Sequence, residues 1–347
     1  MIEHLRANVR AMSGYVPGEQ PRDGAFVKLN TNENPYPPSP RVFEALREAL
    51  TGDRLRRYPD PTGAHFRRTA GRVLGVDPDG VLIGNGSDDV LTIVTRAFVP
   101  EGGLVVSPTP SYLLYRTLAD LQGARLQTVP FTADWELPEP WPVEGAHLTF
   151  LANPNSPSGT TVDRRRLERL AEELNGPLVV DEAYADFADD NALDLPRSRG
   201  VIVSRTFSKS YALAGVRFGF AVADPAVVRE LLKVKDSYNC DVLSLTAAAA
   251  ALEDQEYFRT IRTKVLATRG RMTEALTRLG FTIPPSRANF VWCRCGDRPM
   301  KPLYEELKRR GILVRYMNYE GSGDGLRISV GTEAEADRLV DELRQLL

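Results

Sequence analysis

The chain has 347 residues, of which 42% are hydrophobic and 26% are charged, with a formal net charge of −2. This length can bury a large core and is expected to form two domains. The near-neutral charge gives no general attraction to nucleic acid or to an anionic membrane surface. No apolar run approaches the roughly 20 residues that span a bilayer. We therefore expect small molecules rather than nucleic acid or membrane as partners.

Cysteines and histidines are scarce, at three each. Cys293 and Cys295 share one face of an expected strand, but two further zinc ligands do not follow at motif spacing. The N-terminal residues also lack the apolar core of a signal peptide. We predict a cytoplasmic protein without a metal site.

The first forty residues are rich in prolines and turn-forming residues, as in the stretch 29–38. Proline excludes regular structure and biases its predecessor toward extended backbone. We predict an extended arm that packs across a domain or a partner subunit. Helices are expected over 40–50 and 64–74.

From residue 80, short apolar runs alternate with amphipathic segments. The pattern predicts strands at 81–84, 104–106, 124–129, 147–152, 178–180, 201–203 and 218–223 and helices at 87–98, 111–121 and 164–174. Such alternation indicates an α/β fold with a mostly parallel sheet covered by helices on both faces. Ligands of such sheets bind at the carboxyl ends of the strands.

The last hundred residues have a different pattern. It predicts a broken helical stretch over 225–279, strands at 289–294, 312–315 and 326–330, and helices at 301–309 and from 333 onward. We predict a large domain over 41–250 and a smaller α+β domain over 251–347, with the arm 1–40 contributing to the small domain and to dimer contacts.

A lysine, Lys209, follows the apolar run 201–203 on a turn rich in serine and threonine. A lysine at the end of a buried strand can lose its hydration and react as an amine with carbonyl groups. Arg217 follows eight residues later, and together with Thr206 and Ser208 it suits a phosphate dianion. This combination predicts pyridoxal phosphate, an aldehyde and a phosphate ester, as the cofactor. The alternative is a surface turn with a solvated lysine.

The loop 84–89, between an expected strand and an expected helix, offers a second phosphate contact. Its glycines free the backbone, and N–H groups at a helix N-terminus bind phosphate. Asp88 and Asp89 argue against anion contacts through side chains, so the backbone or Ser87 would make them. Ser87 or Asp88 could instead be a helix N-cap.

Asp181 ends the buried run 178–180. A carboxylate there could pair with the pyridine nitrogen of the cofactor and make its ring an electron sink. A helix N-cap or a ligand of a divalent metal are the alternatives. The rigid loop 153–159 could supply Asn155 or Ser156 to the ring hydroxyl, although its turn chemistry alone indicates only a loop.

Taken together, the segments 153–159, 181–184 and 208–217 resemble, in order and spacing, those of fold-type I pyridoxal-phosphate-dependent aminotransferases. The segments 29–35 and 57–60 resemble the histidinol-phosphate aminotransferase branch of that family. The resemblance covers nearly the whole chain, and its motifs are specific as a set.

The resemblance implies a role for each matching residue. Lys209 would bind the cofactor covalently and later move a proton, Asp181 would pair with the pyridine nitrogen, and Tyr184 would hydrogen-bond the ring hydroxyl. Tyr112 would stack on the ring, unless it is an ordinary helix aromatic. The residues expected to hold the phosphate are Gly86, Ser87, Ser208, Arg217 and Tyr58, the last from a partner subunit. That match implies a homodimer with shared sites.

One position departs from the family pattern. Ser156 stands directly before Pro157, where the family usually has an asparagine that contacts the ring hydroxyl. Either Ser156 makes a contact of shorter reach or Asn155 substitutes for it.

Arg327, in the segment 326–331, resembles the arginine that binds the substrate carboxylate in most of the superfamily. In the histidinol-phosphate branch it would bind the substrate phosphate, helped by Arg315, and Tyr15 matches a substrate-contacting tyrosine. The same guanidinium groups would bind glutamate or 2-oxoglutarate. The expected activity belongs to histidine biosynthesis. An aminotransferase for aromatic or other amino acids and a threonine-phosphate decarboxylase remain alternatives.

Overall fold

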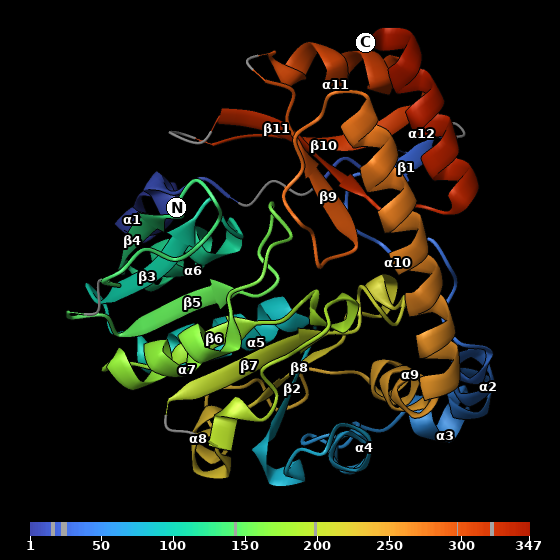
Figure 1. The fold of residues 1–347 in the computed structure, drawn as a ribbon. Helices are drawn as coiled ribbons and strands as arrows, with labels where there is room; N and C mark the ends of the chain where they lie inside the picture. The colour runs from blue at the N-terminus through green and yellow to red at the C-terminus, as the bar shows by residue number, and fades with distance from the viewer. Residues whose placement is uncertain (15–17, 22–25, 142–143, 198–199, 297, 320–322) are drawn as a thin grey trace.

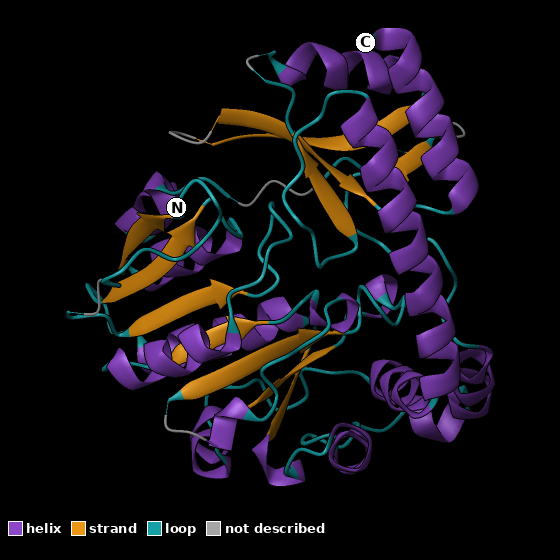
Figure 2. Ribbon diagram, viewed as in Figure 1, coloured by secondary structure: helices purple, strands orange, loops and turns teal. Residues whose placement is uncertain are grey.

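The computed structural model describes residues 1–14, 18–21, 26–141, 144–197, 200–296, 298–319 and 323–347. These residues form two sheets with helices packed around them (Figure 1 and Figure 2). Among them, no helix is both long and apolar enough to cross a membrane.

The larger sheet has seven strands in the order β2-β8-β7-β6-β5-β3-β4. They are β2 (Val81–Gly84), β3 (Leu104–Thr109), β4 (Arg125–Pro130), β5 (Leu148–Ala152), β6 (Leu178–Asp181), β7 (Val201–Thr206) and β8 (Gly219–Val222). Neighbouring strands are parallel except at β8, which runs antiparallel to both β2 and β7. The prediction of a mostly parallel sheet is confirmed.

Both faces of this sheet are buried. In β6, Leu178 and Val180 pack into one core and Val179 packs into another, because successive side chains of a strand point to opposite faces. Helices α5 (Ser87–Phe98), α6 (Leu114–Gln122) and α8 (Pro225–Leu231) contribute to the core of Val179, and α7 (Arg164–Glu173) to the other. This two-sided covering explains why the central strands are continuous apolar runs.

The other helices of the first 253 residues lie at the sheet edge and beyond it. They are α1 (Ala7–Ala11), α2 (Pro40–Ala49), α3 (Gly52–Leu55), α4 (Ala64–Leu74) and α9 (Val242–Glu253). Helix α2 begins where predicted, because the Ser39 side chain accepts a hydrogen bond from the Arg41 backbone at 3.1 Å and Pro40 occupies the first helical position.

The smaller sheet has the order β1-β10-β11-β9. Its strands are β1 (Val27–Leu29), β9 (Phe290–Cys293), β10 (Ile312–Tyr319) and β11 (Gly323–Ser329), and its helices are α10 (Gln255–Arg278), α11 (Met300–Arg309) and α12 (Glu333–Leu346). Figure 1 shows α10 running from beside α9 up to α12, so that it flanks both parts of the molecule.

Val27–Leu29 of the arm is extended, as expected, and pairs in parallel with β10. Ala7–Ala11, a stretch without proline, forms a short helix that was not expected. One helix boundary was wrong. Helix α6 begins at Leu114 rather than at residue 111, because Ser111 and Tyr112 belong to the loop that lines the cavity described next.

Candidate active site

A cavity of about 480 Å³ lies at the carboxyl ends of β3, β5, β6 and β7 and is bounded on its other side by the arm and by β10 and β11. Among the predicted site residues, it is lined by Ser87, Tyr112, Ser156, Asp181, Tyr184, Ser208, Lys209, Arg217, Arg315 and Arg327. Side chains from separate strand ends and from both sheets thus meet around one space.

Lys209 follows β7 and is half-buried. Its Nζ donates a hydrogen bond to the Thr31 carbonyl at 3.0 Å. Burial lowers the pKa of Lys209 to about 8, and the Arg327 guanidinium acts in the same direction. A substantial fraction of this amine is therefore neutral near physiological pH, which is the form that attacks a carbonyl carbon.

Asp181 is the last residue of β6 and is buried. Its Oδ2 accepts a hydrogen bond from the Tyr115 hydroxyl at 3.0 Å, while Oδ1 has no hydrogen-bond partner among the described residues. Burial raises the pKa of Asp181 to about 7, against the opposing effect of the Tyr115 hydroxyl. A buried carboxylate oxygen without a partner at the wall of a cavity suits a cationic N–H group of a ligand.

The start of α5 and the loop after β7 form an anion-binding corner. Gly86 precedes the helix with φ +87°, and a Cβ there would come within 2.6 Å of Arg217 Nη2. Arg217 itself has φ +56°, a backbone conformation that is unusual for a residue other than glycine, and it donates to Ser208 Oγ at 3.2 Å. Helix N–H groups, a hydroxyl and a guanidinium converge here, as a phosphate requires.

An acidic side chain also stands at this corner. Asp88 Oδ2 lies 3.7 Å from Arg217 Nη2, and Asp88 Oδ1 accepts from the Tyr112 hydroxyl at 3.2 Å. Asp88 thus orients the arginine and the tyrosine, a role that the sequence did not predict.

Asn155 and Ser156 point in different directions. Asn155 is buried within its loop, where it bonds Ser111, the Pro110 carbonyl and Ser158. Ser156 lines the cavity and accepts a hydrogen bond from Arg327 Nη1 at 3.0 Å. Of the two alternatives, only Ser156 faces the space that a cofactor ring would occupy.

Arg315 and Arg327 lie directly opposite each other on β10 and β11. Like charges at paired positions of two strands repel, so this arrangement favours an anion between or beside them. Arg327 Nη2 donates to the Asn30 carbonyl at 3.2 Å, and its Nε has no hydrogen-bond partner among the described residues. Both arginines line the cavity.

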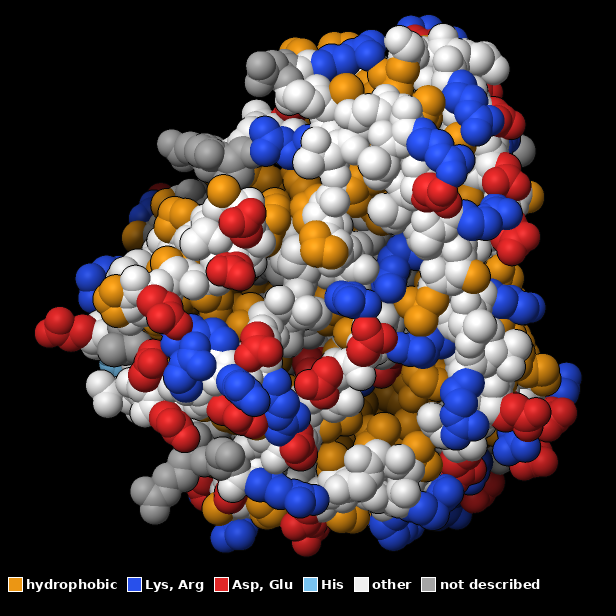
Figure 3. Space-filling view, in the orientation of Figure 1, with side chains coloured by type: hydrophobic (Ala, Val, Ile, Leu, Met, Phe, Trp, Pro, Cys, Tyr) orange, Lys and Arg blue, Asp and Glu red, His pale blue; other side chains and the backbone are white. Residues whose placement is uncertain are grey.

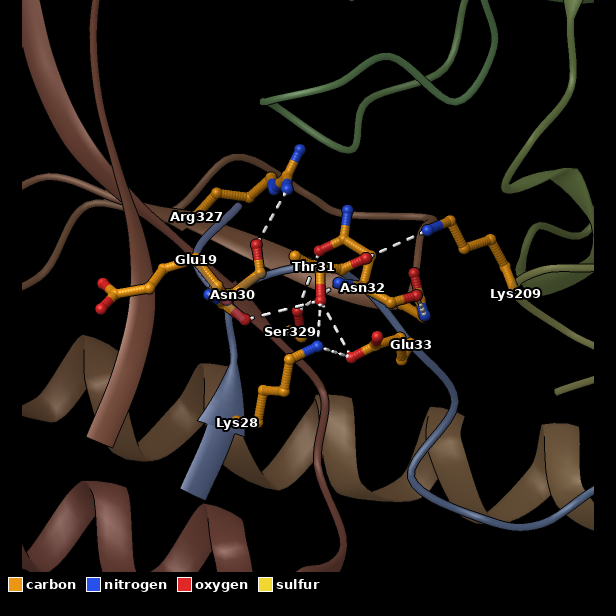
Figure 4. Close-up of polar contacts among 10 residues, drawn as sticks. Glu19, Lys28, Asn30, Thr31, Asn32, Glu33, Lys209, Arg327 and Ser329 are labelled. Atoms are coloured by element: carbon orange, nitrogen blue, oxygen red, sulfur yellow. Dashed lines mark hydrogen bonds and ion pairs between the residues drawn. The ribbon is translucent and has the colours of Figure 1, made fainter. Parts of the chain in front are cut away.

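The arm segment 30–34 lines the cavity and accepts hydrogen bonds from Lys209, on the loop after β7, and from Arg327 of β11 (Figure 4). Asn32 donates through Nδ2 to the Tyr184 hydroxyl at 2.9 Å and through its backbone N–H to Ser329 Oγ at 2.8 Å. Lys28 pairs with Glu33, which lines the cavity. The proline pattern identified this stretch as an arm, but without the pairing of β1 with β10 it could not reveal that these side chains enter the site.

Among the described residues of the predicted site, Gly86, Asn155 and Tyr58 do not line this cavity. Tyr58 is 80% exposed and stacks on Tyr238, with ring centroids 4.4 Å apart. Tyr15 lies outside the described residues.

On the face shown in Figure 3, basic and acidic side chains are interspersed rather than gathered into patches of one sign. The described residues also contain no group of three or more acidic, histidine or cysteine side chains that could hold a metal ion.

Comparison with known proteins agrees with this geometry. The family model for aminotransferase class I and II matches residues 25–343. The chain is 53% identical to the histidinol-phosphate aminotransferase of Rhodopirellula baltica over 96% of this chain and 92% of that protein. It is 48% identical to histidinol-phosphate aminotransferase 1 of Trichormus variabilis over 100% of both chains.

Solved structures give the same result. The histidinol-phosphate aminotransferase of Sinorhizobium meliloti in complex with pyridoxal 5′-phosphate superposes with a TM-score of 0.88 at 28% identity, covering 99% of this chain and 98% of that one. Aspartate aminotransferase of Thermus thermophilus shares the fold, with a TM-score of 0.85 at 20% identity over 99% of this chain and 100% of that one. On this evidence, the chain belongs to the class I and II aminotransferase family.

Proposed function

We propose that the chain is a pyridoxal-phosphate-dependent aminotransferase that moves an amino group between histidinol phosphate and 2-oxoglutarate, and between glutamate and imidazole-acetol phosphate in the reverse direction. The relatives of 53% and 48% identity carry the name histidinol-phosphate aminotransferase. Within the structure, the observation that carries the proposal is the pair Arg315 and Arg327, which forms a second anion site in the same cavity as Lys209.

The residues present fit pyridoxal phosphate. The corner of Gly86, Ser208 and Arg217 suits its phosphate, and the unpartnered Oδ1 of Asp181 suits its protonated pyridine nitrogen. Tyr184 and Ser156 are the cavity-lining hydroxyls for the ring oxygen, and Tyr112 offers a ring for stacking. When bound, the cofactor supplies an electrophilic carbonyl carbon and an electron sink for the electrons of a Cα–H bond.

The residues of the chain supply binding and proton transfer. Lys209 Nζ, in the neutral form that its pKa of about 8 makes accessible, can accept a proton from a substrate Cα and return it as a general base and acid. The Asp181 carboxylate would pair with the protonated pyridine nitrogen of the cofactor. Arg217 and Ser208 would bind the cofactor phosphate. Arm residues Asn30, Thr31 and Glu33 form one wall of the cavity.

The paired arginines explain how one pocket accepts two kinds of substrate. Histidinol phosphate carries a phosphate and no carboxylate, whereas glutamate carries two carboxylates. A guanidinium group binds the oxygens of either anion through two parallel hydrogen bonds. We infer that Arg315 and Arg327 bind the substrate phosphate in one half-reaction and a carboxylate in the other.

We further propose a homodimer in which Tyr58 reaches the phosphate corner of the partner subunit. Tyr58 is 80% exposed and is not among the described residues that line the cavity of its own chain, which supports this arrangement. Residues 41–250 would form the large domain and 251–347 the small one, joined by the arm. A biosynthetic enzyme acting on diffusible phosphorylated metabolites would work in the cytoplasm.

The test loads the protein with pyridoxal phosphate and follows its absorbance on addition of single substrates. Histidinol phosphate and glutamate should each convert the bound cofactor to its amino form, and 2-oxoglutarate should reverse the change. Faster conversion by phenylalanine would favour an aromatic aminotransferase. Release of carbon dioxide from threonine phosphate would favour the decarboxylase and refute the proposal.

Variants of the paired arginines test the substrate assignment. Arg315→Gln and Arg327→Gln should each raise the KM for histidinol phosphate at least about tenfold, because each removes one charged hydrogen-bonding partner of the phosphate. Arg271→Gln, which breaks an exposed ion pair with Asp337 on the outer helices, is the control and should leave the KM unchanged. An unchanged KM in both site variants would contradict the assignment.

A further inference from the structure

A tyrosine beneath the cavity makes a contact that no step above uses. Tyr115, on α6, is buried, and its hydroxyl donates to Asp181 Oδ2 at 3.0 Å. Nothing in the sequence distinguished Tyr115 from an ordinary apolar position of an amphipathic helix. Its phenolic oxygen is nevertheless the only hydroxyl hydrogen-bonded to the Asp181 carboxylate among the described residues.

Packing fixes the position of this hydroxyl. The Tyr115 ring stacks on Phe150 with a centroid distance of 4.6 Å and an interplanar angle of 4°, and the Tyr112 ring meets its edge at 5.7 Å. Phe150 lies on β5, which pairs in register with β6 so that Ala152 stands beside Asp181. Two neighbouring strands and α6 therefore hold the donor and the acceptor in one place.

Because a carboxylate is planar, the hydrogen bond from Tyr115 also fixes the orientation of the whole Asp181 carboxylate group. The two oxygens of the group lie in one plane at a fixed separation, so holding Oδ2 also fixes the direction of Oδ1. Oδ1 is the atom without a hydrogen-bond partner among the described residues, and Asp181 lines the cavity.

We propose that Tyr115 is a positioning residue, whose hydroxyl holds the Asp181 carboxylate so that Oδ1 is presented, as an ionised acceptor, to the pyridine nitrogen of the cofactor. The purpose of this contact rests on the proposed function, since it assumes that Asp181 pairs with that nitrogen.

Electrostatics explain why such a donor is needed. Burial raises the pKa of Asp181 to about 7, and the negative charges of Asp88 on α5 and of the neighbouring Glu182 raise it further. Glu182 forms an ion pair with Arg205 at 2.7 Å. The Arg205 guanidinium is therefore paired with Glu182 rather than with Asp181. The Tyr115 hydroxyl lowers the pKa of Asp181, and the Ala183 backbone N–H acts in the same direction to a smaller extent. The pKa of Tyr115 lies well above its usual value because of burial and of Asp181, so the phenol stays a donor.

Tyr115→Phe tests the proposal, because it removes the hydroxyl and keeps the ring that stacks on Phe150. Tyr257→Phe is the matched control, since it removes a hydroxyl that donates to the Pro37 carbonyl at 2.9 Å, on residues that do not line this cavity. Urea unfolding should show that both variants are folded and that their midpoints are similar.

The first measurement uses the cofactor-free protein. Carbon-13 NMR of labelled aspartate carboxyls, with the Asp181 signal assigned by its loss in Asp181→Asn, gives the titration of this group. We expect Tyr115→Phe to raise the pKa of Asp181 by about one unit, a tenfold shift in its protonation equilibrium, and Tyr257→Phe to leave it unchanged. Identical titrations in wild type and Tyr115→Phe would overturn the proposal.

The second measurement uses protein loaded with nitrogen-15-labelled pyridoxal phosphate. The pyridine nitrogen should be protonated in wild type and in Tyr257→Phe, and its chemical shift should move toward the unprotonated value in Tyr115→Phe. A purely structural role of Tyr115 would not move this signal, so an unchanged shift would also overturn the proposal. An unprotonated nitrogen in wild type would instead refute the role of Asp181 in the proposed function, while the carboxyl titration still decides whether Tyr115 holds Asp181.

Discussion

Replacing Asp181 by asparagine should stabilise the cofactor-free protein at neutral to alkaline pH. The Asp181 carboxylate is buried, and no cationic side chain among the described residues forms an ion pair with it. Asparagine has nearly the same shape, and its carbonyl oxygen can still accept the hydrogen bond from Tyr115. It carries no charge to bury.

The magnitude follows from the pKa of the folded state. Burial raises the pKa of Asp181 to about 7 from its ordinary value of 3.8. Roughly three pKa units, at about 1.4 kcal/mol each, set an upper limit of about 4 kcal/mol. Because Asp181 lines a cavity that water can enter, we expect about half of this, roughly 2 kcal/mol.

The sign is set by linkage. The raised pKa means that the folded state binds a proton more tightly than the unfolded state, so the contribution of Asp181 to stability falls as pH rises from about 4 to about 7. The advantage of Asp181→Asn should therefore grow across this window and level off above it. Below about pH 4 both proteins carry a neutral side chain here in both states, and the advantage should vanish.

Urea unfolding of the cofactor-free proteins at pH 5 and pH 8 measures the effect. Asp134→Asn, at an exposed position without a described partner, is the control and should change stability little at either pH. A variant no more stable than wild type at pH 8, or a difference that does not change with pH, would refute the reasoning. The same substitution should weaken binding of pyridoxal phosphate, as expected where a site is built for function at a cost in stability.

Three further predictions follow from the geometry. Gly86→Ala should weaken binding of pyridoxal phosphate at least about tenfold in an equilibrium titration, because a Cβ would meet Arg217 Nη2 at 2.6 Å. Gly102→Ala, at a position with φ +73° and open space around it, is the control for backbone strain alone. Lys209, with a pKa of about 8, should react faster than the exposed Lys301 in competitive reductive methylation of the cofactor-free protein at pH 8, and equal rates would contradict its perturbed environment. Leu276→Ala, at a fully buried position of the small core, should lower the free energy of unfolding by about 2–5 kcal/mol in urea, and a loss below about 1 kcal/mol would show that the core collapses around the change.

Much of the fold was predictable because its signals are local. The apolar run 178–180 is continuous because both faces of its strand are buried, and it ends at Asp181, at the carboxyl end of the strand. The order of strands was not predictable, because it depends on which runs pair across long stretches of chain. The antiparallel direction of β8 was equally unpredictable, since the short apolar run Gly219–Val222 has the same pattern as the strands β2 and β7 that it opposes.

The same distinction holds for the candidate site. Lys209 and Asp181 stand at the ends of strand signals and Arg217 directly precedes one, and their chemistry is specific enough to suggest one cofactor. Tyr115 gave no signal, because a tyrosine at a helix position that faces the core has the same pattern as any buried aromatic. The choice between Asn155 and Ser156 depended on the turn of a single loop, which sequence chemistry leaves open.

The pairing of β1 with β10 has a consequence for how the enzyme is made. Val27 lies beside Ile312, so residues near the beginning of the chain find their partner only when nearly all of it has been synthesised. At typical rates this takes on the order of tens of seconds. Until then Thr31 and Asn32 have no sheet to anchor them beside Lys209 and Tyr184. The nascent chain can thus form the phosphate corner long before the arm closes over it, and the reactive amine becomes enclosed last.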